Sequence, residues 1–270
     1  MKKILLLYKL LIISCLSANL SNEELVNDNV NKEIKTCNGG KSAECFNLAR
    51  MFFSGNGVKQ DKIKAKELYV KACNEGNLDS CYNLGVMYSN GDGIAQNKIK
   101  AMELYTKTCN SGDLSSCYNL ALMYSNGDGI TQNKIKAKEL YVISCDGGYQ
   151  LSCNNLAKIF YKGDGGVIDT SKALELLTKA CDSGNLYGCN NLGVMYFDGS
   201  GVKQDKIKAM ELYTKACNSG NFNSCYNIGV MYFDGDGVEQ DSKKARKMFD
   251  KACINGLDVA CYNAKMWNNP

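Results

Sequence analysis

The cysteines have the most regular spacing of any reactive residue type in this sequence. Fourteen of the fifteen follow one rule: seven lie 36 residues apart, and each has a second cysteine eight residues later. An even, regularly spaced set of this kind is typical of a disulfide framework in an oxidising compartment. The predicted pairs are Cys37–Cys45, Cys73–Cys81, Cys109–Cys117, Cys145–Cys153, Cys181–Cys189, Cys217–Cys225 and Cys253–Cys261.

Zinc binding is the alternative chemistry for paired cysteines. Zinc sites usually have two to four residues between the paired cysteines and often include histidine. Here the spacing is C-x7-C, and the chain has no histidine. Buried free thiols are a third interpretation, but they would not require a constant offset. The sequence therefore predicts no metal site and no cofactor, and it excludes Ser-His-Asp and Cys-His catalysis.

An asparagine follows the second cysteine of each pair by two residues. These asparagines are Asn47, Asn83, Asn119, Asn155, Asn191, Asn227 and Asn263. On a helical wheel, Asn83 points away from the stripe of Cys81, Leu84 and Tyr88, toward a groove or the adjacent repeat. A column of amides on an inner face can donate to and accept from the backbone of an extended peptide. The alternative is an inter-repeat hydrogen bond that fixes the stacking, and the recurrence does not separate the two.

The residue directly before each of these asparagines varies along the chain. It is Phe46, Tyr82, Tyr118, Asn154, Asn190, Tyr226 and Tyr262 in turn. Variation at one fixed place is typical of a ligand-facing position, and equally of a tolerant surface. The predicted ligand-binding residues are Asn83, Asn119, Asn155, Asn191, Asn227, Tyr82 and Tyr118.

Two helices in each period must position these side chains. Between Asn97 and Cys109 the apolar residues recur at helical spacing, and Asn97 stands where an N-cap is needed. A second helix is predicted from about Asp79 to Tyr88, ended by the glycines of the following loop. A fixed period of this length with two antiparallel helices per unit predicts an all-α, right-handed α-solenoid.

The first 18 residues have the pattern of an export signal. Lys2 and Lys3 precede a mostly apolar run, and small residues follow at Ser17 and Ala18. We therefore expect a signal peptide over residues 1–18 and a single solenoid over residues 19–270, in a periplasmic or secreted protein. The run ending at Cys15 resembles a lipobox, so lipid attachment at Cys15 is the alternative.

Charge is nearly balanced in the rest of the chain. Without Lys2, Lys3 and Lys9, 29 of the 32 basic residues remain against 28 acidic ones. A nucleic-acid-binding domain normally carries a clear basic excess, so nucleic acid is not an expected partner. The N-terminal apolar run is too short to span a membrane, and no other segment qualifies. We expect a monomer that binds a protein or peptide ligand.

The repeat resembles a known family in the motif C-[YN]-N-L-G-x-M-Y-x-x-G-x-G-V-x-Q-[DN]-x-x-K-A-x-E-L-[YL]-x-K-A-C. This motif resembles the Sel1-like repeat, and the 36-residue period with C-x7-C resembles the cysteine-rich proteins of Helicobacter and relatives. The resemblance covers nearly all of residues 22–267. It implies an adaptor scaffold in protein complexes. It also implies penicillin binding with weak β-lactamase activity, and hence β-lactams or cell-wall fragments as ligands.

The β-lactamase implied by the resemblance lacks its motifs in this sequence. Metal enzymes of this kind need histidine, and serine enzymes need Ser-x-x-Lys together with Ser-Asp-Asn and Lys-Thr-Gly. The one Ser-x-x-Lys match, Ser200 to Lys203, lies in a loop where other repeats have Asn56 or Asp236. No catalytic residue is assigned. The preferred function is an exported, disulfide-stapled scaffold that binds peptide or protein ligands in its concave groove, and the alternative is weak β-lactamase activity.

Overall fold

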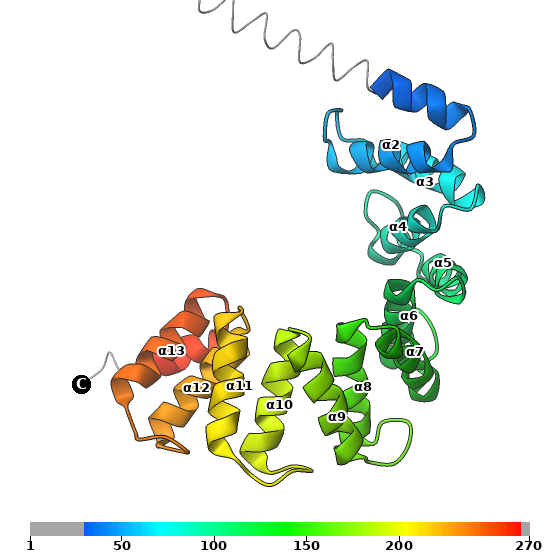
Figure 1. The fold of residues 1–270 in the computed structure, drawn as a ribbon. Coiled ribbons are helices and arrows are strands. Elements are labelled where there is room, and N and C mark those ends of the chain that lie inside the picture. The colour runs from blue at the N-terminus through cyan, green and yellow to red at the C-terminus, as the bar shows by residue number, and fades with distance from the viewer. Residues whose placement is uncertain (1–29, 266–270) are drawn as a thin grey trace, which may run out of the picture. The chain divides into compact units, whose positions relative to one another are not determined.

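Within residues 30–265, which the computed structural model describes, every regular element is an α-helix (Figure 1). A helix that includes residues 30–38 comes first. The next are α2 (Ser42–Ser54), α3 (Lys62–Asn74), α4 (Leu78–Asn90), α5 (Lys98–Asn110), α6 (Leu114–Asn126), α7 (Lys134–Asp146) and α8 (Gln150–Lys162). They are followed by α9 (Thr170–Asp182), α10 (Leu186–Asp198), α11 (Lys206–Asn218), α12 (Phe222–Asp234), α13 (Ser242–Ile254) and α14 (Asp258–Lys265). The expected signal peptide and Cys15 lie outside the described residues.

Each repeat consists of an A helix, which carries the second cysteine of a pair, and a B helix, which ends at the first cysteine of the next pair. The A helices are α2, α4, α6, α8, α10, α12 and α14. The predicted all-α repeat fold is confirmed. The helix predicted from Asn97 begins one residue later, because the Asn97 side chain caps it by accepting a hydrogen bond from the backbone N–H of Lys100.

Glycines in the left-handed region end the A helices. Gly91, with φ 73°, closes α4, and its N–H donates to the carbonyl of Met87. A residue with a side chain is strained at this φ, which explains why the same loop position is glycine in other repeats. This sharp stop turns the chain back so that the B helix packs against the A helix that precedes it.

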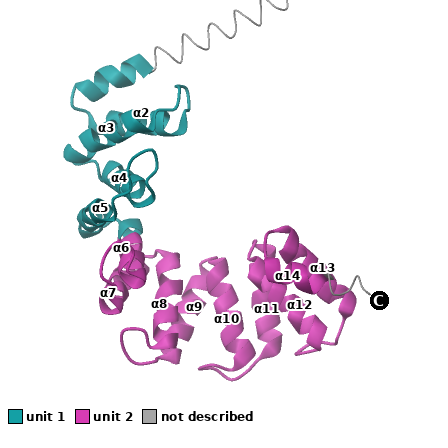
Figure 2. Ribbon diagram, turned by 180° about the vertical axis from the view of Figure 1, so that it is seen from behind, with its two compact units in different colours: residues 1–116 teal, residues 117–270 magenta. Residues whose placement is uncertain are grey.

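The chain divides into two compact units, residues 1–116 and 117–270 (Figure 2). In the first unit, Leu48, Tyr69 and Met87 belong to one buried apolar cluster drawn from α2, α3 and α4. In the second unit, Tyr141 and Leu177 belong to a similar cluster built on α7 to α10. Each core is thus a run of small contacts between neighbouring helices, as expected for a repeat protein.

Disulfides join the end of each B helix to the start of the following A helix. The structure has the pairs Cys37–Cys45, Cys73–Cys81, Cys145–Cys153, Cys181–Cys189, Cys217–Cys225 and Cys253–Cys261, with Cα atoms 4.4–4.9 Å apart. Cys109 and Cys117 are disulfide-bonded as well. The expected disulfide in each repeat is confirmed.

Lysines near the ends of the B helices stabilise the disulfide turns from the next repeat. Lys71 Nζ donates to the carbonyl of Cys37 at 2.8 Å, and Lys251 Nζ donates to that of Cys217 at 3.4 Å. Lys107 and Lys215 make the equivalent bonds to Cys73 and Cys181. A cation at a helix C-terminus satisfies a free carbonyl and complements the helix dipole. Four of the turns, those that begin at Cys37, Cys73, Cys181 and Cys217, are therefore held by a disulfide and by an ammonium group.

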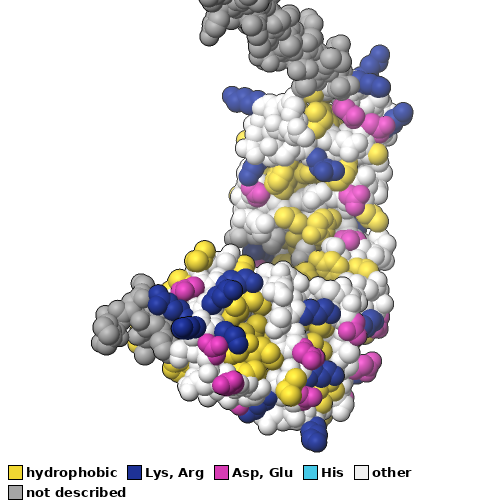
Figure 3. Space-filling model, turned by 60° about the vertical axis from the view of Figure 1, so that its left-hand side comes forward, with side chains coloured by type: hydrophobic (Ala, Val, Ile, Leu, Met, Phe, Trp, Pro, Cys, Tyr) yellow, Lys and Arg dark blue, Asp and Glu magenta, His cyan; other side chains and the backbone are white. Residues whose placement is uncertain are grey.

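The surface carries both signs of charge side by side. On the face seen in Figure 3, basic and acidic side chains are interspersed and apolar side chains lie between them. Among the described residues, no helix is long and apolar enough to cross a membrane.

Candidate functional site

The asparagines that recur in each repeat have a clear structural role in the second unit. Asn191 Nδ2 donates to Asn154 Oδ1 at 2.7 Å, and Asn227 Nδ2 donates to Asn190 Oδ1 at 3.4 Å. Each acceptor lies 37 residues before its donor, in the preceding repeat. Asn263 makes the same contact, at 3.3 Å, with the hydroxyl of Tyr226. The amides therefore form a ladder between adjacent A helices.

The ladder explains the variable column that precedes the asparagines. Its members in this unit are tyrosines or asparagines, and both supply an oxygen that accepts from the next repeat. These hydrogen bonds are the inter-repeat bonds that the sequence offered as the alternative to ligand binding. Contact of the same amides with a ligand stays a prediction.

Asn155 reaches a different oxygen of the same unit. Its Nδ2 donates to the hydroxyl of Tyr141 at 3.4 Å. Burial raises the pKa of Tyr141 to about 12, and the bond from Asn155 acts in the opposite direction. Burial likewise raises the pKa of Tyr118, against a smaller lowering by Asn155. The predicted residues Asn119 and Tyr82 also have interaction partners.

Asn83 breaks the ladder in the first unit. The residue 37 positions before it is Phe46, whose side chain has no oxygen to accept a hydrogen bond. Within residues 30–265, the Asn83 side chain makes no hydrogen bond to the protein, and it is only half-buried. Its amide is thus available to a ligand, unlike those of Asn191, Asn227 and Asn263.

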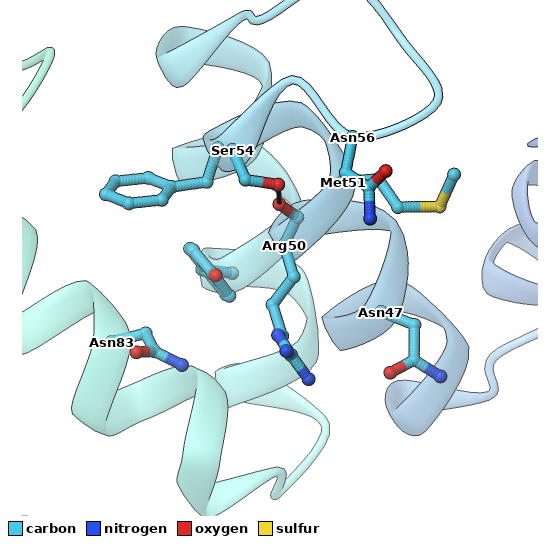
Figure 4. A pocket seen from close by; sticks show the side chains of 8 residues that line it. Asn47, Arg50, Met51, Ser54, Asn56 and Asn83 are labelled. Atoms are coloured by element: carbon cyan, nitrogen blue, oxygen red, sulfur yellow. Dashed lines mark hydrogen bonds between the residues drawn. The ribbon is translucent and has the colours of Figure 1, made fainter.

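Asn83 lines a pocket of about 400 Å³ in the first unit, between α2, α3 and α4. The lining residues are Asn47, Arg50, Met51, Phe53, Ser54, Asn56, Tyr69 and Asn83. In Figure 4 the side chain of Arg50 extends into the space between Asn47 and Asn83. The pocket therefore brings two amides from successive repeats together with a guanidinium group.

The pocket is positively charged. None of its lining residues is acidic, and the Arg50 guanidinium lies 5.6 Å from the ring centre of Phe46. Burial raises the pKa of Tyr69 to about 12, while the nearby Arg50 lowers it by a smaller amount. The Tyr69 hydroxyl therefore stays protonated at neutral pH and can donate a hydrogen bond. The arrangement suits an anionic group rather than a cation or a metal.

A second pocket of about 100 Å³ lies in the other unit, between α8, α9 and α10. It is lined by Ala157, Lys158, Tyr161, Leu177, Asn191, Val194 and Met195. Four of its positions follow members of the first pocket by 108 residues. These pairs are Arg50/Lys158, Phe53/Tyr161, Tyr69/Leu177 and Asn83/Asn191. Both pockets thus lie at the same position of the repeat. We call a pocket at this position an inter-repeat notch.

The notch differs between repeats at one position. Arg50 and Lys158 occupy a place where the other described repeats have Val86, Leu122, Val194 and Val230. Neither cation was among the predicted site residues. The signal in the sequence was a long charged side chain at a position that is otherwise a short apolar one.

Leu177 contributes to the apolar character of the second pocket. At the equivalent position Tyr69, Tyr105, Tyr141 and Tyr213 carry a ring, and leucine leaves that space empty. The walls are then mainly alanine, leucine, valine and methionine side chains. The first notch is polar and the second is apolar, although both have a cation at the rim.

The Ser200 motif has no arrangement suited to acyl transfer. Ser200 lies in the loop between α10 and α11, where its Oγ accepts a hydrogen bond from the Tyr161 hydroxyl at 3.3 Å. Lys203 is exposed. In the described part of the chain, no group of three histidine, cysteine, aspartate or glutamate residues is placed to hold a metal.

Comparison with known proteins agrees with this architecture. The Sel1 repeat family model matches residues 45–77, 78–113, 114–149, 150–185, 186–221 and 223–257. The comparison with curated proteins finds no match. Similar solved structures include the Escherichia coli protein c5321, a protective antigen displaying an SLR fold. It is 26% identical with a TM-score of 0.80, and the alignment covers 88% of this chain and 51% of that one.

Two further structures are similar. A Sel1 repeat protein from Oxalobacter formigenes is 22% identical with a TM-score of 0.75, over 79% of this chain and 85% of that one. Helicobacter pylori cysteine rich protein B is 30% identical with a TM-score of 0.38, over 46% of this chain and 94% of that one. This chain spans about half the length of the E. coli protein. Because six repeats match the family model across most of its length, the chain belongs to the Sel1 repeat family.

Proposed function

We propose that this protein is an exported, disulfide-stapled scaffold that binds peptide segments of partner proteins through its inter-repeat notches. Sel1 repeats generally mediate protein interactions. The observation that carries the proposal is the recurrence of one notch in both units, each time with a cation in place of a short apolar residue. A residue that only packed the repeats together would be expected to stay apolar.

Export is supported by the cysteines and by the N-terminal segment. A disulfide in every repeat requires an oxidising compartment to form and persist. Residues 1–18 have the charge and hydropathy pattern of a signal peptide. The E. coli structural neighbour is described as a protective antigen.

The proposed binding mode is anchoring at separate notches rather than along a continuous amide ladder. The amides of Asn191, Asn227 and Asn263 already donate to the preceding repeat, so a ligand would have to break these bonds to use them. The notches offer unused volume and a cation instead. Separate anchors in a larger surface are typical of protein recognition.

The test is a selection of random 12-residue peptides displayed on phage against the oxidised protein, followed by ¹⁵N NMR mapping of the enriched peptides. We expect shifts in the backbone amides of α2 and α4 or of α8 and α10. The variants Arg50→Ala and Lys158→Ala should reduce enrichment, and Arg246→Ala on α13 is the matched control. Absence of enriched peptides, or shifts confined to B helices, would contradict the proposal.

A further inference from the structure

We propose that the notch formed by Asn47, Arg50, Tyr69 and Asn83 recognises the terminal carboxylate of a peptide chain. This inference rests on the proposed peptide-binding function and names the chemical group that this notch would take.

Arg50 is unusual in this chain. It is one of two arginines among 32 basic residues, all the others being lysine. The other arginine, Arg246, lies with its Nε 3.7 Å from a carboxylate oxygen of Asp250. Within the described residues Arg50 has no such ion pair, and its neighbour is the face of Phe46. A guanidinium group binds a carboxylate through two parallel hydrogen bonds, which a lysine cannot do.

The other groups of the notch complete a site for a chain end. Tyr69 lines the pocket, and burial keeps its hydroxyl protonated, so this group is a hydrogen-bond donor. The Asn47 and Asn83 amides can each donate to a carboxylate oxygen and accept from a peptide N–H. Neither amide has a hydrogen-bond partner among residues 30–265. The notch thus holds several donors and no competing carboxylate.

A terminal carboxylate fits better than an acidic side chain inside a long peptide. Only two of the asparagine amides, those of Asn47 and Asn83, are available, because the others already have partners. The last residue of a peptide offers a carboxylate and a backbone N–H within one residue, so a single pocket that holds a guanidinium group and two amides can bind both groups. A volume of about 400 Å³ leaves room for that residue and its side chain.

The second notch provides an internal comparison. Asn191 there donates to Asn154, and Leu177 replaces the tyrosine, so the spare amide of Asn83 and the hydroxyl of Tyr69 have no counterpart. The Tyr161 hydroxyl at this notch donates to Ser200 Oγ. Its volume is about 100 Å³. The same fold position without these donors should not discriminate a carboxylate from an amide.

The experiment uses the oxidised protein with three probes. They are a pool of acetylated random hexapeptides with a free terminal carboxylate, the same pool amidated at its end, and the amidated pool with one fixed internal glutamate. The readout is the Nε–Hε signal of arginine in ¹⁵N NMR. The chain has only Arg50 and Arg246, so two signals are expected and Arg246 serves as the internal reference.

We expect the free-carboxylate pool to shift the Arg50 signal and the amidated pool to leave it in place. Arg50→Ala should weaken binding of the free-carboxylate pool by roughly tenfold or more, the effect of losing a charge-assisted hydrogen bond. Asn83→Ala should weaken it by roughly threefold to tenfold. Phe46→Tyr should also weaken binding, because the new hydroxyl gives Asn83 the ladder partner it lacks.

Four outcomes would overturn the inference. Equal shifts from the free and amidated pools would show that the carboxylate is not recognised. An equal shift from the amidated glutamate pool would assign the notch to acidic side chains. Peptides that perturb the A helices without moving the Arg50 signal would refute this site but leave the proposed function intact. If no pool perturbs any part of the protein, the proposed function fails as well.

Discussion

The inter-repeat ladder makes a sharp prediction about two asparagines at the same place in the repeat. The Asn191→Ala variant loses two hydrogen bonds. In the parent, Asn191 Nδ2 donates to Asn154 Oδ1 at 2.7 Å, and Asn191 Oδ1 accepts from Asn190 Nδ2. In Asn83→Ala the chain loses no hydrogen bond to the described protein. The first variant should therefore be clearly destabilised and the second should not.

The magnitude follows from the burial of the partner. Asn154 is only 4% exposed, so its carbonyl oxygen loses its partner where water has little access. Leaving such an acceptor unsatisfied costs about 1–3 kcal/mol of unfolding free energy. A chain of this size changes its melting temperature by roughly 2–4 °C for each kcal/mol. We expect Asn191→Ala to melt roughly 2–12 °C below the parent, and the unfolding free energy of Asn83→Ala to stay within about 0.5 kcal/mol of that of the parent.

The assay is thermal unfolding of the oxidised proteins, followed by far-ultraviolet circular dichroism. The double variant Asn154→Ala/Asn191→Ala is the decisive control, because removing both partners leaves no orphaned oxygen. It should be less destabilised than the sum of the two single variants. Equal melting temperatures for Asn83→Ala and Asn191→Ala, or strict additivity in the double variant, would refute the ladder.

Four further predictions concern the rest of the molecule. Full reduction of the disulfides should unfold the helices near room temperature, which circular dichroism would record. Each disulfide closes a nine-residue loop and contributes roughly 2–3 kcal/mol to the unfolding free energy, whereas the net stability of a domain is only about 5–15 kcal/mol. Unchanged helicity after reduction would contradict this. If the oxidised protein hydrolyses nitrocefin, Ser200→Ala should leave the rate unchanged, and loss of turnover would restore a serine mechanism. Stability in urea should fall as pH rises from about 10 to about 12, since Tyr69 and Tyr141 ionise first in the unfolded chain; phenylalanine at both positions should flatten that slope. Gly193→Ala should lower the melting temperature although alanine favours helix, because the new Cβ would lie 2.7 Å from the Tyr213 ring; a higher melting temperature would show that the ring moves aside.

Most of the fold could be predicted from the spacing of a few residue types. The 36-residue period, the N-caps such as Asn97 and the loop glycines such as Gly91 are local signals. Local signals fix helices, and helices in series fix a repeat fold. The disulfide pairing followed for the same reason, since both cysteines of a pair lie on one short turn.

The candidate site could not be predicted in the same way, because it depends on contacts between repeats. The sequence marked Asn83 and Asn191 as equivalent, and they occupy the same place in the repeat. The partner of Asn191 lies 37 residues earlier, one position off the period, and that offset is set by how the helices stack. Asn83 has Phe46 at this offset and therefore no partner. Arg50 and Lys158 were overlooked because a charge at one position of an exposed helix face normally has no structural meaning.

The position of the polar notch follows from the break in the ladder. Where the earlier repeat supplies an oxygen, as Asn154 does for Asn191, the asparagine is used for stacking. Where it supplies Phe46, the amide of Asn83 has no partner, and Arg50 lies beside it without a carboxylate. Phe46, which lacks the tyrosine hydroxyl, and Arg50, which adds a cation, thus turn a packing position into a site that can bind an anion. Repeat proteins can acquire a binding site by such single departures, because the remaining repeats keep the scaffold stable.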